Sequence, residues 1–142
     1  VQSLKPYLTE SQGTADMNKR YDAGMEELKE HLGEDAEKYI AKLEAISPFF
    51  ARVNVEFAYG DIYKETDKVL DQVTQELITV SALTVLGYAI PQLKVHIDAA
   101  LNRGATQDQI IATITQMIDY CGFPAATNAL LAAKEVFDAR VG

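Results

Sequence analysis

The sequence predicts an all-α protein. Apolar residues recur three and four positions apart along most of the chain, which is the spacing of one helix face. Residues that start and stop helices separate these stretches, and no stretch alternates apolar and polar residues as a half-buried strand does. A chain of 142 residues is long enough to enclose one core. We therefore expect an N-terminal arm over residues 1–13 and a single helical domain over residues 14–142.

Three helices are predicted in the first half of the chain. The first begins near residues 14–16, where threonine and aspartate are good N-caps, and ends at Gly33. Acidic residues then favour the start of a second helix, because the helix dipole is positive at its N-terminus. Ser47 and Pro48 are typical of the N-cap and the first position of a third helix. The polar residues 64–66 predict a connection.

The second half is predicted to be built around one apolar helix that begins near residues 66–67 and ends near Gly87. Residues 77–86 are apolar on nearly every side of this helix. That pattern predicts burial all round, either at the centre of the fold or in an oligomer. Later helices are expected over residues 92–103, from a capping-box pattern at residues 106–109 to a break at residues 121–124, and over residues 124–140.

The composition argues against several classes of function. A formal net charge of −8 disfavours nucleic acid, whose phosphates attract basic surfaces, and disfavours an anionic membrane surface. No apolar run is long enough to span a bilayer, and the N-terminus has no signal-peptide core. The single cysteine, Cys121, has no partner for an internal disulfide. We expect a cytoplasmic protein that binds neither nucleic acid nor membranes.

Two ionisable residues, Glu76 and His96, interrupt the apolar faces of consecutive predicted helices. An ionisable group on such a face is costly unless it has a partner or a role. Because a short connection should fold the two helices back on each other, the two side chains could share a pocket. The spacing alone leaves two interpretations open, a pair that performs chemistry or a buried pair that joins the helices. The apolar positions are Val69, Val73, Val80 and Leu83 on the first face, and Leu93 and Ala100 on the second.

Six short segments stand out by their order and spacing: RYDAG at 20–24, YGDIY at 59–63, ELI at 76–78, PQLKVH at 91–96, ALNRGAT at 100–106 and QMIDYCGFPA at 116–125. Together they resemble the carboxymuconolactone decarboxylase family, within the larger group that includes the alkylhydroperoxidase D proteins. The resemblance implies an all-α fold with a central helical hairpin, built as a trimer or a hexamer, with active sites near subunit contacts. It also places Glu76 and His96 at the family's expected active-site positions.

Differences between this sequence and the motifs of the wider group bear on which reaction is expected. The peroxidase branch carries a Cys-x-x-Cys pair just ahead of the histidine that matches His96, whereas residues 88–92 contain no sulfur here. Disulfide exchange needs an attacking thiolate and a resolving thiol, so peroxidase activity is disfavoured and Cys121 is interpreted as a small buried hydrophobe. The chain is closer to the decarboxylase branch. Gln75 occupies the position where that branch often has a basic residue, so the sequence does not decide the identity of the substrate.

The resemblance and the residues together predict a cofactor-free carboxy-lyase that acts on a small carboxylated lactone. A histidine, with an ordinary pKa of about 6.5, can donate or accept a proton near neutrality, which is the role expected of His96. Glu76 is predicted either to act as an acid, its pKa raised by an apolar pocket, or to orient the imidazole. No metal is expected, because one Glu and one His fall short of a zinc ligand set. The alternative is a non-catalytic or small-molecule-binding oligomeric member of the same family.

Four further residues are candidates for binding a carboxylate substrate. Lys94 and Arg103 lie on the predicted helix of His96, where either could meet a carboxylate, also across a subunit boundary. Tyr88 and Tyr120 could supply hydroxyl donors. His31, in the last turn of the first predicted helix, is expected only to complement the helix dipole.

Overall fold

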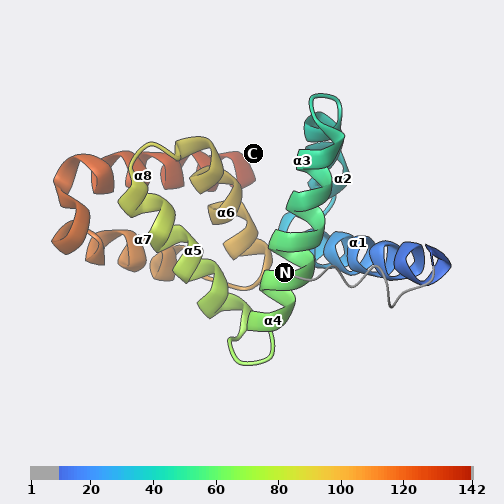
Figure 1. Cartoon of the computed structure of the whole chain (residues 1–142). Helices are drawn as coiled ribbons and strands as arrows, with labels where there is room; N and C mark the ends of the chain where they lie inside the picture. Colours follow the sequence, from blue (N-terminus) through green and yellow to red (C-terminus); the bar gives the residue numbers. More distant parts are fainter. Residues whose placement is uncertain (1–9, 142) are drawn as a thin grey trace. The chain divides into compact units, whose positions relative to one another are not determined.

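The computed structural model describes the backbone of residues 10–141 and the side chains of residues 19–141. Every regular element in this part of the chain is a helix, which confirms the all-α prediction (Figure 1). Residues 1–9 of the expected arm lie outside the described residues. The first helix begins at Glu10, earlier than residues 14–16. The chain divides into two compact units, one of residues up to 29 and 34–68, the other of residues 30–33 and from 69 onward.

The first unit contains most of α1 (Glu10–Leu32), α2 (Asp35–Glu44), and a continuous rod. The rod consists of α3 (Pro48–Val53), the π-helix η2 (Asn54–Tyr63) and α4 (Lys64–Thr66) (Figure 1). Ser47 caps it as predicted, its hydroxyl accepting a hydrogen bond from the backbone N–H of Phe50 at 3.1 Å. The predicted connection at residues 64–66 is wrong, because these residues form the last helical turn of the rod.

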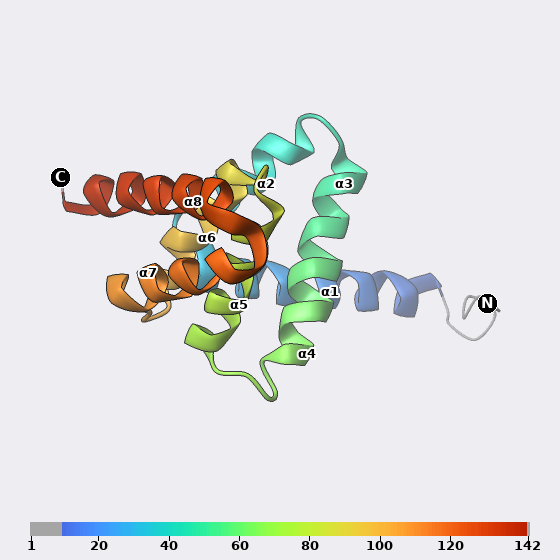
Figure 2. The ribbon, with the colours of Figure 1, turned by 90° about the vertical axis from the view of Figure 1, so that its left-hand side faces the viewer.

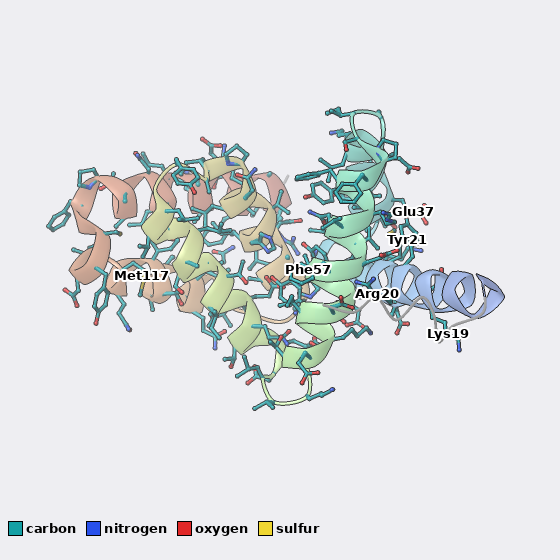
Figure 3. The ribbon with its side chains drawn as sticks, viewed as in Figure 1. Lys19, Arg20, Tyr21, Glu37, Phe57 and Met117 are labelled. Atoms are coloured by element: carbon teal, nitrogen blue, oxygen red, sulfur yellow. The ribbon has the colours of Figure 1, made fainter. Side chains whose placement is uncertain are left out.

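Helix α1 and the π-helix η2 touch backbone to backbone. A Cβ atom on Gly24 would lie 2.1 Å from the carbonyl oxygen of Val55, so only glycine allows this approach. Arg20 of α1 lies beside the crossing (Figure 3). It forms two ion pairs there: Arg20 Nη2 lies 2.6 Å from Asp61 Oδ2, and Arg20 Nη1 lies 3.4 Å from Glu56 Oε2. Close backbone packing therefore fixes the crossing, and the charged pairs add to it.

The second unit is a bundle of α5 (Gln72–Leu86), α6 (Ile90–Asn102), α7 (Gln107–Gln116) and α8 (Ile118–Val141), in which α5 contacts the other three helices. The predicted start near residues 66–67 is wrong. Asp71 is the N-cap, with extended backbone and a carboxylate that accepts the N–H of Thr74 at 2.8 Å. Helix α5 ends at Gly87, whose φ of 77° suits glycine. The buried core of this unit is formed by Val80, Leu93, Ile97, Ala100, Ala105, Ile110, Ile114, Ala126, Ala129, Ala132 and Ala133.

The predicted all-round burial of residues 77–86 is not found within the chain by itself. Ile78, Val85 and Leu86 remain 50%, 43% and 48% exposed. The opposite face of the helix, including Val80 and Thr84, is buried. Helix α5 is thus central to its unit through one face and leaves an apolar face uncovered.

The start of α7 follows the sequence signal, but this helix ends at Gln116, earlier than the predicted break at residues 121–124. Thr106 and Gln109 form the predicted capping box, each side chain accepting the other's backbone N–H, at 3.0 and 2.9 Å. The predicted break at residues 121–124 is a kink inside α8, located at Gly122 with φ 77° and ψ 174° (Figure 2). No helix in the described part of the chain is long and apolar enough to cross a membrane.

Candidate functional site

Glu76 and His96 lie next to each other in the second unit. Glu76 projects from α5 into the bundle and is fully buried. His96 projects from the neighbouring helix α6, and its side chain is 15% exposed. Glu76 Oε2 and His96 Nδ1 are 3.5 Å apart. The structure therefore brings together the two ionisable residues that interrupted apolar faces in the sequence.

A third residue of this cluster, His31, has a place that sequence reasoning missed. It is fully buried, and its Nδ1 contacts Glu76 Oε1. Its backbone carbonyl accepts a hydrogen bond from Asn102 Nδ2 at 3.3 Å. The expectation that His31 only complements a helix dipole is wrong. A signal was present, because His31 lies three residues after Leu28 and so shares the apolar side of its helix.

Arg103, at the C-cap of α6, supplies the positive charge beside Glu76. Its guanidinium is almost fully buried, and Nη1 donates to Gln75 Oε1 at 2.9 Å and to Glu76 Oε1 at 3.3 Å. Gln75, interpreted from the sequence as the absence of a basic residue, is in fact an acceptor that holds Arg103. Arg103, from the next helix, thus supplies the positive charge that the sequence appeared to lack beside Glu76.

The charge state of Glu76 follows from these neighbours. Burial raises the pKa of its carboxyl group, but the adjacent imidazoles of His31 and His96 outweigh burial and lower this pKa to about 2. The prediction of a raised pKa is therefore wrong, because it assumed an apolar pocket without basic partners. Glu76 is a carboxylate at neutral pH and cannot donate a proton there. Its other predicted role, orienting the imidazole, agrees with this charge.

The two oxygens of the Glu76 carboxylate have different surroundings. Oε1 is contacted by His31 Nδ1 and Arg103 Nη1. Oε2 is buried and has no hydrogen-bond partner within residues 19–141, and the same holds for His96 Nδ1. The second oxygen is thus directed to His96, the one member of this cluster with an appreciably exposed side chain.

The other predicted binding residues lie apart from this network. Lys94 forms an ion pair with Glu135 of α8. Tyr88 and Tyr120 are 78% and 74% exposed. Their predicted contact with substrate stays a prediction, since a second copy or a ligand would have to meet them at the surface.

Comparison with known proteins decides the family. Residues 48–135 match the sequence model of the Carboxymuconolactone decarboxylase family. The chain belongs to the carboxymuconolactone decarboxylase family. The 4-carboxymuconolactone decarboxylase of Acinetobacter baylyi (strain ATCC 33305 / BD413 / ADP1) is 31% identical over 119 residues, which cover 83% of this chain and 87% of the relative. An uncharacterized 15.0 kDa protein in the nqo9-nqo10 intergenic region of Paracoccus denitrificans is 35% identical over 96 residues, covering 67% of this chain and 70% of the relative.

The segment that matches the family model includes three of the four residues of the charged cluster, Glu76, His96 and Arg103, and begins after His31. The fourth residue is therefore added by the helix that precedes the matched segment. Within residues 19–141, no three His, Cys, Asp or Glu side chains are grouped as metal ligands would be.

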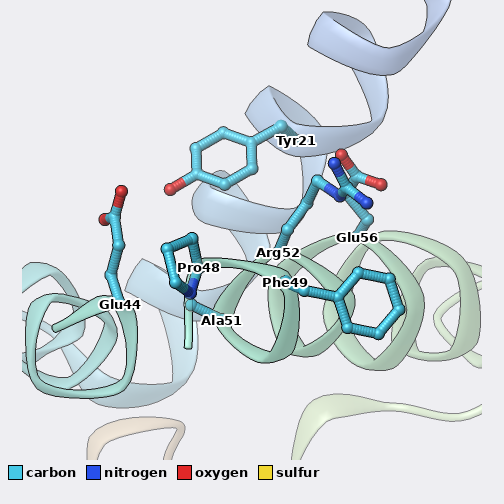
Figure 4. A pocket seen from close by; sticks show the side chains of 7 residues that line it. All are labelled: Tyr21, Glu44, Pro48, Phe49, Ala51, Arg52 and Glu56. Carbon is cyan, nitrogen blue, oxygen red and sulfur yellow. The ribbon is translucent and has the colours of Figure 1, made fainter. Parts of the chain in front are cut away.

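A cavity of about 530 Å³ lies in the first unit, and none of its lining residues belongs to the charged cluster (Figure 4). Its walls carry the cation of Arg52 and the carboxylates of Glu44 and Glu56, so charges of both signs face it. The Arg52 guanidinium lies 5.4 Å from the ring centre of Phe49. The mixed walls favour neither an anionic nor a cationic ligand. The remaining lining residues are Tyr21, Pro48 and Ala51.

Proposed function

We propose that this member of the family is a cofactor-free carboxy-lyase acting on a small carboxylated lactone, as the name of the Acinetobacter relative indicates for that protein. One observation carries the proposal: an ionised, buried Glu76 faces Nδ1 of His96, whose side chain reaches the surface. In this arrangement His96 carries the proton and Glu76 orients it.

The reaction needs little more than one well-placed proton carrier. The bond between the lactone ring and its carboxylate breaks, carbon dioxide leaves, and the electron pair moves into the conjugated ring carbonyl. A proton from the imidazolium of His96 then returns to a ring carbon, and solvent restores the lost proton. Because Nδ1 faces Glu76, proton exchange with the substrate takes place at Nε2.

The cluster is also suited to an anionic substrate. The negative charge of Glu76 is matched by Arg103, so any charge on the two imidazoles leaves the site positive, although the whole chain carries −8. We expect the substrate carboxylate to be bound by residues nearer the surface. Lys94, Tyr88 and Tyr120 keep this proposed role.

A homo-oligomer, a trimer or a hexamer, is part of the same proposal. The apolar face of α5 that includes Ile78 and Leu86 is exposed in the single chain, and a second copy would cover it. In such an assembly the exposed tyrosines of one copy would lie at a contact with another. The cytoplasmic location stays a prediction from the sequence.

A second candidate is a family member that binds a small carboxylate without changing it. Its support is the burial of the cluster, since Glu76 is fully buried and only 15% of the His96 side chain is exposed. A buried ion pair of this kind can also serve fold specificity alone.

Supplying 4-carboxymuconolactone to the purified protein tests the proposal. We expect release of one carbon dioxide per lactone consumed, at a rate well above that of the heat-denatured protein. Calorimetric binding of the lactone without release of carbon dioxide would favour the second candidate. If the protein neither binds nor converts the lactone, both candidates fail for this substrate.

A further inference from the structure

The two carboxylate oxygens of Glu76 have different neighbours. Oε1 is in contact with nitrogen atoms of His31 and Arg103, whereas Oε2 has no hydrogen-bond partner among the described residues and faces His96. We propose that His31 is a positioning residue, which holds Oε1 so that Oε2 is presented to Nδ1 of His96. The catalytic consequence rests on the proposed function, but the geometric claim does not.

The neighbours of His31 Nδ1 determine where its proton lies. A carboxylate oxygen such as Glu76 Oε1 can only accept a hydrogen bond, and the guanidinium of Arg103, 3.5 Å from Nδ1, can only donate one. Nδ1 must therefore carry a proton and donate it to Oε1. The imidazole and the guanidinium then converge on the same oxygen as two donors.

Two donors on one oxygen fix the carboxylate plane. The terminal torsion of a glutamate is broad, so a carboxylate plane without such partners takes a wide range of orientations. Without His31, Oε1 would keep only the hydrogen bond from Arg103 Nη1, at 3.3 Å, and this same nitrogen also donates to Gln75. The contact of His31 comes from a different segment, so that removing it leaves the plane held from one side only.

His31 is itself held in place. Its side chain is fully buried, and its backbone carbonyl accepts the amide of Asn102 from the helix that carries His96 and Arg103. The chain then leaves the helix at Gly33, whose φ of 62° is left-handed. His31 precedes residues 48–135, which match the family model, so this contact comes from the helix ahead of the matched segment.

The protein offers an unusually clear test, because His31 and His96 are its only two histidines. Nitrogen NMR on the intact protein at about pH 8.5, where ordinary imidazoles are neutral, reports which ring nitrogen carries the proton. In His31→Leu the sole remaining imidazole is His96, so no assignment is ambiguous. His31→Asn is the matched control, since its amide nitrogen takes the place of Nδ1 and still donates to Glu76.

We expect the wild-type protein and His31→Asn to keep the proton of His96 mainly on Nδ1, and His31→Leu to lose about half or more of that population. In the lyase assay, kcat of His31→Leu should fall about 10- to 100-fold with KM little changed, and His31→Asn should restore most of it. An unchanged proton position in His31→Leu, or an equal change in both variants, would overturn the proposal.

If His31→Leu does not fold, His31→Gln replaces it, because the glutamine amide reaches the place of Nε2 and cannot donate to Oε1. Loss of the Nδ1 proton in His31→Gln but not in His31→Asn supports the proposal, and equal behaviour of the two contradicts it. The NMR result does not depend on turnover. Absence of lyase activity with the expected NMR change would therefore reject the proposed reaction and keep the positioning role.

Discussion

Glu76 Oε2 and His96 Nδ1 lie 3.5 Å apart, and neither atom has a hydrogen-bond partner within the described part of the chain. A shift of about half an ångström would turn this contact into an ordinary hydrogen bond. Catalytic hydrogen bonds are often long before substrate binds and tighten in the complex. We therefore interpret the pair as a contact that a ligand at Nε2 of His96 completes.

The lowered pKa of Glu76 makes the free energy of unfolding depend on pH in the acidic range. An unfolded glutamate has a pKa of 4.5, whereas the folded one is about 2, so between these values the unfolded chain binds more protons. The carboxylate should thus stabilise the fold above about pH 4.5 and lose this effect as the pH falls towards 2. The loss amounts to about 3 kcal/mol at about 1.4 kcal/mol per pKa unit.

Urea unfolding of Glu76→Gln beside the wild-type protein measures this dependence. The stability difference between them should be large at pH 7 and shrink steadily as the pH falls from 4.5. Asp138→Asn is the control, because that carboxylate is exposed and its pair with Lys134 contributes little. A difference that stays constant over this pH range would contradict an ionised, stabilising Glu76.

Replacing Arg103 should be costly because it leaves a buried carboxylate without its cation. Arg103→Met is expected to lower the free energy of unfolding by about 3–5 kcal/mol. Arg140→Met is the matched control, since Arg140 pairs with Asp98 at the surface and should cost about 1 kcal/mol or less. Similar losses in the two variants, measured by urea unfolding, would show that the buried contacts of Arg103 stabilise the fold no more than a surface ion pair does.

The fold was largely predictable because local signals dominate it. The Ser47 cap, the Thr106–Gln109 capping box and the glycine at Gly87 each marked a helix boundary correctly. The start of α5 was placed too early, because Thr66 and Asp67 are as good N-cap types as Asp71. The choice among them depends on the rod that continues through residues 64–66, a tertiary feature.

The candidate site was predictable only in part. Glu76 and His96 were found because a charged residue on an apolar face is conspicuous in one chain. His31 and Arg103 were not assigned to Glu76, because their contacts join residues 45 and 27 positions apart along the chain. For the same reason the pKa of Glu76 was predicted in the wrong direction, since its basic neighbours are not sequence neighbours.

The close crossing of α1 with the π-helix predicts that replacing Gly24 lowers the stability of the fold. In Gly24→Ala the new Cβ atom would lie 2.1 Å from the Val55 carbonyl oxygen, a backbone atom that cannot move aside easily. We expect a loss of about 2–3 kcal/mol or more in thermal or urea unfolding. Asp22→Ala, at an exposed position of the same helix, should change stability by about 0.5 kcal/mol or less. A Gly24→Ala protein as stable as the wild type would contradict the close approach.

The capping box at the start of α7 should contribute measurably to stability. Thr106→Ala removes the hydroxyl that accepts the Gln109 N–H and is expected to cost about 1 kcal/mol. Thr115→Ala is a fitting control, because its exposed hydroxyl only bonds back to a carbonyl of its own helix. Equal effects of the two substitutions would mean that the cap adds nothing.

The turnover number of His96→Gln tests the central claim most directly. Glutamine keeps the size and polarity of the side chain but cannot carry the proton, so kcat on 4-carboxymuconolactone should fall about 10²- to 10⁴-fold, with the assembly unchanged in size-exclusion chromatography. Gln92→Ala, one turn earlier on the exposed side of the same helix, should retain wild-type turnover. Wild-type turnover in His96→Gln would contradict the assignment of His96 as the proton carrier.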